Sequence, residues 1–246
     1  MRMSENARYI LKVLRRKNSE SEPYFQSFEY FAKTDGDTVA TALRDINART
    51  EIVDIDGNPA EKIEWECSCL QKKCGACAMI VNGIPKLACD SVLTLLTKQK
   101  GGEDRVVTVE PLRKFPKVKD LVVDRSILFE NLKTIRAWLE QDSTLKDKRR
   151  DLAYQASECL QCGCCLEICP NFYVGGEFFG MSAIPVATRL LAETDLKERK
   201  QLISAYLEHG FAGCGKSLAC KDVCPKHIDT GYLLVKANAL SLWRRK

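Results

Sequence analysis

The chain has 246 residues, enough for two domains of ordinary size, and its 45% hydrophobic and 29% charged residues argue against a fibre or a disordered chain. The net charge is only +5 and no run of Lys and Arg is interleaved with aromatic residues, so we expect no nucleic-acid partner. No apolar run is long enough for a transmembrane helix, and the first residues lack the apolar core of a signal peptide. These features predict a soluble, unexported chain without a membrane span of its own.

Strand and turn patterns dominate roughly the first 110 residues. Runs rich in β-formers predict strands over 8–16, 25–33 and 105–112, whereas 38–49 has helical spacing. Residues 56–59 (DGNP) predict a turn, and Asn82-Gly83 predicts a hairpin between two further strands.

Helical patterns follow. They cover residues 126–141, 196–209 and 230–246, with a capping box at Asp195 and Glu198 before the second helix and Gly210 ending it. The change of character near Phe115-Pro116 divides the chain into a β-rich domain, 1–115, and a helical domain, 116–246. The predicted fold class is therefore α+β.

Cysteine is the most informative residue type. There are thirteen cysteines, an odd number, in a chain that is neither short nor marked for secretion, so metal is favoured over a disulfide framework. The two histidines, His209 and His227, are too few to supply several mixed Cys/His zinc sites.

The first cysteine cluster has the C-x4-C-x2-C spacing of a plant-type [2Fe–2S] site. Its predicted ligands are Cys69, Cys74, Cys77 and, beyond the Asn-Gly hairpin, Cys89. Gly75 would let the backbone approach the cluster and donate hydrogen bonds to the sulfurs. A structural zinc held by the same four cysteines is the alternative. Cys67 is left over and is interpreted as a bystander.

The helical domain carries two copies of the bacterial-type run C-x2-C-x2-C-x3-C-P. The first copy is complete, whereas Ser217 replaces the second cysteine of the later copy. The two copies are Cys159, Cys162, Cys165 and Cys169, and Cys214, Ser217, Cys220 and Cys224.

In two-cluster ferredoxins the fourth cysteine of each run ligates the other cluster. This exchange gives one set of four, Cys159, Cys162, Cys165 and Cys224, and one set of three, Cys169, Cys214 and Cys220. Four thiolates suit a [4Fe–4S] cluster, and three suit a [3Fe–4S] cluster with the vacant ligand slot at Ser217. The alternatives are that the Ser217 oxygen, or water, binds a fourth iron. Cys164 does not fit the register and stays spare.

Three different clusters in one chain predict a wire for single electrons. No nucleotide fingerprint, phosphate-binding loop or nucleophile with a partnering base is present, so we expect no catalytic residue on this chain. The substrate and its two-electron cofactor should lie on other subunits.

Four segments together resemble the iron–sulfur subunit of succinate dehydrogenase and fumarate reductase: 67–89, 118–139, 159–172 and 214–228. The resemblance implies a β-grasp [2Fe–2S] domain facing an FAD-bearing flavoprotein subunit. It also implies a helical domain whose [4Fe–4S] and [3Fe–4S] clusters lead to a membrane anchor with its quinone or haem. Electrons would pass from succinate through FAD and the three clusters to quinone, or backwards to fumarate.

The sequence departs from many ubiquinone-binding members of this family. Phe172 and Tyr173 stand where those members have a tryptophan pair, and Gly215 replaces a histidine. These differences favour menaquinone and a haem-bearing anchor of the cytochrome b kind, on the cytoplasmic face of a bacterial inner membrane. Two other hypotheses are a related flavin-linked oxidoreductase with another substrate, and an iron–sulfur regulatory or structural zinc protein.

Overall fold

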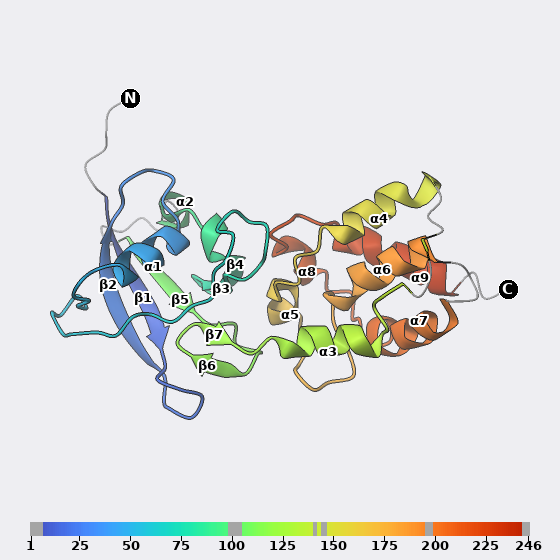
Figure 1. Cartoon of the computed structure of the whole chain (residues 1–246), viewed down its shortest axis with the longest axis horizontal. Coiled ribbons are helices and arrows are strands. Elements are labelled where there is room, and N and C mark those ends of the chain that lie inside the picture. The colour runs from blue at the N-terminus through green and yellow to red at the C-terminus, as the bar shows by residue number, and fades with distance from the viewer. Residues whose placement is uncertain (1–6, 98–104, 140–141, 144–146, 195–198, 243–246) are drawn as a thin grey trace. The chain divides into compact units, whose positions relative to one another are not determined.

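The computed structural model describes residues 7–97, 105–139, 142–143, 147–194 and 199–242. It divides into two compact units, Met1–Asp124 and Arg125–Lys246. Helices dominate the second unit and a sheet the first, so the predicted α+β class is confirmed (Figure 1).

The first unit contains a five-stranded mixed sheet in the order β2-β1-β5-β3-β4. Its strands are β1 Arg8–Arg15, β2 Tyr24–Phe31, β3 Ala78–Val81, β4 Ile84–Leu87 and β5 Val106–Glu110. The central pair β1 and β5 is parallel, and the other neighbours are antiparallel. Helix α1, Val39–Asn47, packs against β2 (Figure 1). A parallel pair flanked by two hairpins, with one helix against the sheet, is the arrangement expected of a β-grasp domain.

Alternation of buried and exposed side chains explains the register in which β1 pairs with β5. Leu11 and Val13 of β1 are fully buried and lie opposite Val107 and Val109 of β5. Because side chains alternate along a strand, a shift of one residue would turn this apolar set away from the core.

The turn at Asn82-Gly83 joins β3 to β4 as predicted. Both residues have positive φ, 50° and 80°, which a two-residue hairpin turn of this kind requires. Gly57 in the predicted turn at 56–59 likewise has a φ of 82°.

Short elements complete the first unit. They are the 3₁₀ turn η1 Ala88–Asp90, helix α2 Leu93–Thr97, and a small hairpin of β6 Lys117–Lys119 and β7 Val122–Val123. This hairpin was not expected from the sequence, and it belongs to the first unit. The division therefore lies between Asp124 and Arg125, whereas the sequence pattern places the change near Phe115-Pro116.

Helix α6, Ala183–Glu193, is the centre of the second unit, because nearly all of its side chains are buried. It packs against four other helices, α3 Ser126–Thr134, α4 Arg150–Ser157, α7 Arg199–Tyr206 and α9 Thr230–Leu242. The remaining elements are η2 Asp147–Arg149, α5 Cys164–Ile168, the π-helical turn η3 Leu207–Phe211, and α8 Ala219–Asp222.

Two predicted helix ends are wrong. The helix predicted over 126–141 stops at Thr134, because Arg136 adopts a left-handed φ of 54° that the α-helix cannot continue through. Gly210 does not end α7, since a π-helical turn continues to Phe211. A Cβ on Gly210 would lie 3.0 Å from the Tyr206 ring, so this glycine makes room for that ring. The predicted capping box at Asp195 and Glu198 lies outside the described residues.

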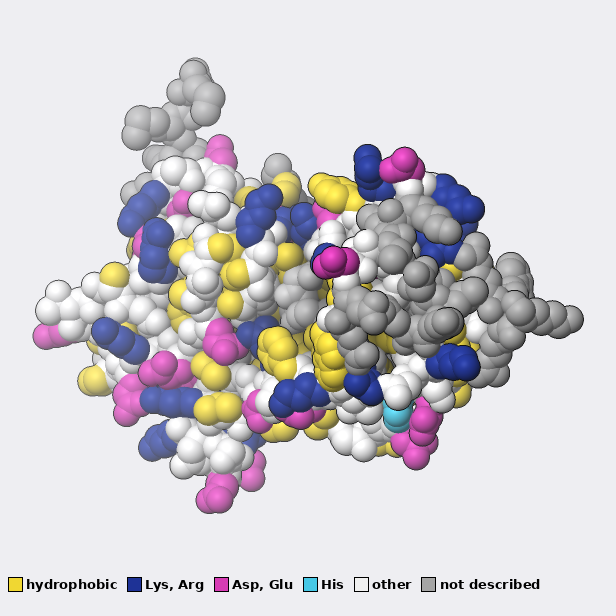
Figure 2. Space-filling model, turned by 45° about the vertical axis from the view of Figure 1, so that its right-hand side comes forward, with side chains coloured by type: hydrophobic (Ala, Val, Ile, Leu, Met, Phe, Trp, Pro, Cys, Tyr) yellow, Lys and Arg dark blue, Asp and Glu magenta, His cyan; other side chains and the backbone are white. Residues whose placement is uncertain are grey.

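Charged side chains of both signs are mixed on the surface. On the face drawn in Figure 2, Lys and Arg side chains of the first unit stand beside Asp and Glu. Ion pairs of the first unit include Lys33 with Asp45 and Lys72 with Asp90, each 2.7 Å long. No helix in the described part of the chain has the length and apolar character needed to span a membrane.

Candidate cluster-binding sites

None of the thirteen cysteines, all of which lie within the described residues, forms a disulfide. Eleven of them are the predicted cluster ligands, and they fall into three groups, one in the first unit and two in the second. No three His, Cys, Asp or Glu side chains within the described residues are grouped so that they could hold a single metal ion. The fit to iron–sulfur clusters therefore depends on the all-sulfur donor sets and on the hydrogen bonds that reach them.

The β3–β4 hairpin brings two of the first four cysteines together. Cys77 directly precedes β3 and Cys89 follows β4, and the Ala88 N–H donates to the Cys77 carbonyl oxygen over 2.9 Å. Burial raises the pKa of the Cys77 thiol to about 12, and the charges of the neighbouring Cys89 and Cys74 sulfurs contribute to this rise.

The loop before β3 directs backbone N–H groups at sulfur. Gln71 and Lys73 each donate to the Cys69 sulfur over 3.3 Å, and Lys72 donates to the Cys89 sulfur over the same distance. These donors follow from positive φ angles of 53° at Leu70 and 57° at Lys72. Successive N–H groups turned to one side form a concave anion-binding surface, which suits thiolates and the sulfides of a cluster.

The same N–H groups change the acidity of Cys69. The Gln71 N–H hydrogen bond, with contributions from Cys74 and Lys73, lowers the pKa of the Cys69 thiol to about 7. Cys69 interacts with Cys74, and Cys77 interacts with Cys89 and Cys74, so the four predicted ligands lie in one neighbourhood. Gly75 has a φ of 76°, and its approach to a cluster stays a prediction. Cys67 is exposed just before this loop.

The second group of cysteines is buried in the helical unit. Burial, with contributions from the nearby Cys162 and Cys224 sulfurs, raises the pKa of Cys159 to about 11. Burial also raises the pKa of Cys165 well above its usual range, and the Cys162, Cys159, Cys220 and Cys224 sulfurs act in the same direction. The last cysteine of the second run, Cys224, therefore lies near Cys159 and Cys165 of the first run.

Two neighbouring groups lower the pKa of the Cys162 thiol. A hydrogen bond from the Cys164 thiol lowers the pKa of Cys162 to about 7, and the Arg125 guanidinium acts in the same direction. Cys164 is fully buried on α5 and was interpreted as spare from the sequence; it contacts a predicted ligand.

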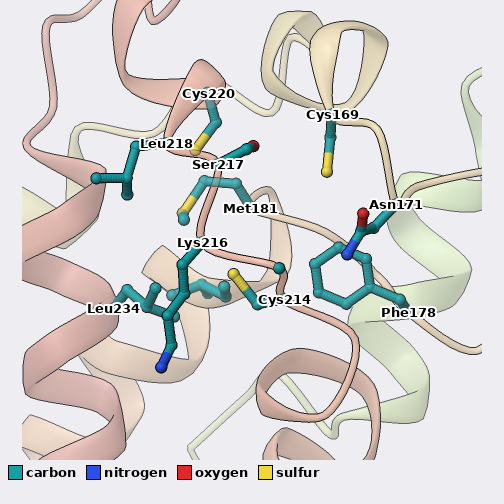
Figure 3. Close-up of a pocket in the computed structure, with 12 residues that line it drawn as sticks. Cys169, Asn171, Phe178, Met181, Cys214, Lys216, Ser217, Leu218, Cys220 and Leu234 are labelled. Atoms are coloured by element: carbon teal, nitrogen blue, oxygen red, sulfur yellow. The ribbon is translucent and has the colours of Figure 1, made fainter.

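The third group of cysteines lines a pocket together with Ser217. Figure 3 shows the sulfurs of Cys169, Cys214 and Cys220 directed toward one space. Burial raises the pKa of Cys220, and the Cys169 and Cys214 sulfurs add to that rise. Ser217 is flanked by Lys216 and Leu218, which have left-handed φ angles of 57° and 58°.

Packing of α5 against α8 explains why the two runs exchange their last cysteines. Cys169 follows α5 and lies with Cys214 and Cys220, whereas Cys224 follows α8 and lies with Cys159 and Cys165. Each run therefore begins one group of sulfurs and ends in the other.

Three polar residues near the sulfurs were not found from the sequence. Gln161 donates to the Cys159 sulfur over 3.2 Å, and the Thr230 hydroxyl lies 3.5 Å from the Cys220 sulfur. Asn171 donates to the Gly213 carbonyl oxygen over 2.7 Å beside the pocket. Their hydrogen bonds form only in the folded chain, so no spacing of residues in the sequence predicts them.

Comparison with known proteins finds two family matches along the chain. Residues 10–130 match the family described as "2Fe-2S iron-sulfur cluster binding domain", and residues 155–228 match the "4Fe-4S dicluster domain" family. A chain of the Mycobacterium smegmatis Sdh1 complex in the apo form superposes with a TM-score of 0.72, with 98% of each chain covered. At 24% identity this likeness shows the fold alone.

Sequence similarity to curated proteins extends over nearly the whole chain. The succinate dehydrogenase iron-sulfur subunit of Bacillus subtilis (strain 168) is 32% identical over 246 residues, covering 96% of this chain and 93% of that protein. The fumarate reductase iron-sulfur subunit of Escherichia coli O6:H1 is 32% identical over 196 residues, covering 74% and 78%. The chain therefore belongs to the family of succinate dehydrogenase and fumarate reductase iron–sulfur subunits.

Proposed function

We propose that this chain relays single electrons between an FAD-bearing flavoprotein subunit and the quinone site of a membrane anchor, as part of a succinate dehydrogenase or fumarate reductase. The observation that supports the proposal is the placement of the last cysteine of each run: Cys224 lies near Cys159 and Cys165, and Cys169 lines a pocket with Cys214 and Cys220. An exchange of last cysteines between runs is the ligand arrangement of two-cluster ferredoxins, which are electron carriers.

The proposed ligands are those of the sequence analysis. Cys69, Cys74, Cys77 and Cys89 hold a [2Fe–2S] cluster. Cys159, Cys162, Cys165 and Cys224 hold a [4Fe–4S] cluster, and Cys169, Cys214 and Cys220 hold a [3Fe–4S] cluster. When bound, such clusters accept and release one electron at a time at potentials set by cluster type, charge and hydrogen bonds to sulfur.

The chain's own residues bind the clusters and tune them. The N–H groups of Gln71, Lys72 and Lys73 stabilise thiolate charge at the first site. Burial of Cys159 and Cys165 lowers the local dielectric at the second site, which strengthens every hydrogen bond made there. No residue of this chain is proposed to act on succinate or fumarate.

The packing around Gly215 supports a quinone site that has no histidine at this position. A Cβ on Gly215 would lie 2.9 Å from the Asn171 Nδ2 atom, which is tied to Gly213. A histidine side chain would have to displace Asn171. This favours a menaquinone-type partner through a haem-bearing anchor, with the chain held peripherally on the cytoplasmic face of the membrane.

The test is EPR spectroscopy on the purified complex before and after addition of succinate. We expect an oxidised-state [3Fe–4S] signal that disappears on reduction, and a [2Fe–2S] signal that appears. Cys214→Ser should remove the [3Fe–4S] signal, whereas Cys67→Ser should leave all signals intact. Clusters that are present but are not reduced by succinate would instead favour a related flavin-linked oxidoreductase with another substrate.

A further inference from the structure

The side-chain amide of Gln161 bridges a predicted cluster ligand and the start of a core helix. Its Nε2 atom donates to the Cys159 sulfur over 3.2 Å and to the Ser182 carbonyl oxygen over 2.9 Å. Ser182 is buried and directly precedes α6. The amide is therefore anchored on the most buried helix of the unit.

The chemistry of the two partners fixes the orientation of this amide. A carbonyl oxygen and a thiolate sulfur are both acceptors, so the NH₂ group must face them and supply one proton to each. The amide oxygen then points the other way. It is buried and has no hydrogen-bond partner among the described residues.

Holding Gln161 in this position costs free energy in two ways. Its φ of 52° is a left-handed conformation that side-chain-bearing residues rarely adopt. A buried acceptor without a partner loses its hydrogen bonds to water without replacement. Costs of this kind are concentrated at functional sites, where the surrounding structure holds the strained residue in place.

A hydrogen bond to a ligand sulfur acts differently on the two oxidation states of a cluster. Reduction adds negative charge to the cluster and its thiolates, so an N–H donor stabilises the reduced state more than the oxidised state. The effect is enlarged by burial, because the low local dielectric strengthens the interaction.

We propose that Gln161 is a positioning residue that raises the reduction potential of the cluster held by Cys159, through the amide fixed between the Cys159 sulfur and the Ser182 carbonyl. The proposal rests on the proposed function, since it requires a [4Fe–4S] cluster on Cys159. Gln161 is not one of the predicted ligands, so the proposal gives a role to a residue that the cysteine spacing does not identify.

Gln161→Met tests this, because methionine has similar length and no N–H donor. Gln161→Leu is a second variant of different shape. The matched control is Gln155→Met, the same substitution on an exposed position of α4. The readout is the midpoint potential of the [4Fe–4S] signal in an EPR-monitored redox titration of the purified complex, with the [2Fe–2S] midpoint as an internal reference.

We expect the [4Fe–4S] midpoint to fall in both Gln161 variants, with the [2Fe–2S] midpoint and the Gln155→Met complex unchanged. An unchanged [4Fe–4S] midpoint with the cluster retained would overturn the proposal. Loss of the cluster from both variants would also overturn it, because the amide would then be holding the cluster and not setting its potential. Absence of a [4Fe–4S] signal from the wild-type complex would reject the proposed function itself.

Discussion

Arg15 and Asp120 form a buried, two-pronged ion pair in the first unit. The Arg15 Nε atom donates to Asp120 Oδ1 over 2.9 Å, and its Nη2 atom donates to Oδ2 over 3.0 Å. Both side chains are 3% exposed or less. The carboxylate also accepts the N–H groups of Arg16 and Glu64, at 3.0 and 2.9 Å. The pair thus joins the end of β1 to the β6–β7 turn and to the segment that leads into the first cysteine loop.

Asp120→Asn should strongly destabilise this unit, because it leaves the Arg15 charge buried without its counter-charge. Removing one partner of a buried pair costs about 3–5 kcal/mol. The measurement is denaturant-induced unfolding of the purified chain, followed by circular dichroism. Asp45→Asn is the matched control, since the Lys33 and Arg44 partners of Asp45 are exposed and such pairs contribute about 0–1 kcal/mol. Equal losses in the two variants would contradict the assignment of Asp120 as a structural anchor.

The positions of Cys169 and Cys224 predict which cluster each of them ligates. Cys224→Ser should weaken or abolish the [4Fe–4S] signal, and Cys169→Ser should do the same to the [3Fe–4S] signal, because each cysteine lies with the other run's sulfurs. The measurement is EPR on the purified complexes, with the [2Fe–2S] signal as a reference for assembly. If each run ligated its own cluster, the two variants would exchange their effects.

Thr230 should tune the proposed [3Fe–4S] cluster in the way that we propose for Gln161 and the [4Fe–4S] cluster. Its hydroxyl lies 3.5 Å from the Cys220 sulfur and is buried at the start of α9. Thr230→Val removes the donor with little change of shape, so the [3Fe–4S] midpoint should fall in a redox titration while the [4Fe–4S] midpoint stays. Thr188→Val is the control, because the buried Thr188 hydroxyl donates to the Ile184 carbonyl oxygen over 2.7 Å and not to sulfur. A shift of equal size in both variants would point to general loosening of the unit.

Local rules explain which features could be predicted from the sequence. The Asn82-Gly83 turn was predictable because few residues other than Asn and Gly accept two successive positive φ angles. The iron–sulfur domains were predictable because a cluster fixes the spacing of its ligands within a loop, and both domains match family models. The β6–β7 hairpin was missed because strands of three and two residues are too short to show alternation.

Other features depend on contacts between distant segments. Leu70 and Lys72 adopt left-handed φ angles although neither is Gly or Asn, so the N–H groups aimed at Cys69 and Cys89 left no signal in the sequence. Gln161 meets Ser182 only after α6 is packed. The early end of α3 also left no signal, because nothing in the residue type of Arg136 indicates its left-handed φ.

Ser217 stands where the first run has its second cysteine, and two substitutions test whether this position is a vacant ligand slot. Its loop lines the pocket of Cys169, Cys214 and Cys220, so a thiol at this position would supply a fourth sulfur. Ser217→Cys should convert the [3Fe–4S] cluster toward [4Fe–4S] and lower its potential, because a further thiolate adds negative charge. Electron exchange with the quinone side should then slow.

Ser217→Ala is the matched control, because it removes the hydroxyl and adds no ligand. If the vacant slot is real, the alanine variant keeps the oxidised-state [3Fe–4S] signal and its quinone activity, and only the cysteine variant loses them. If the serine oxygen instead bound a fourth iron, the wild-type complex would lack the [3Fe–4S] signal, and Ser217→Ala would create it. A cysteine variant that kept the three-iron signal with full quinone activity would show that residue 217 does not reach the cluster.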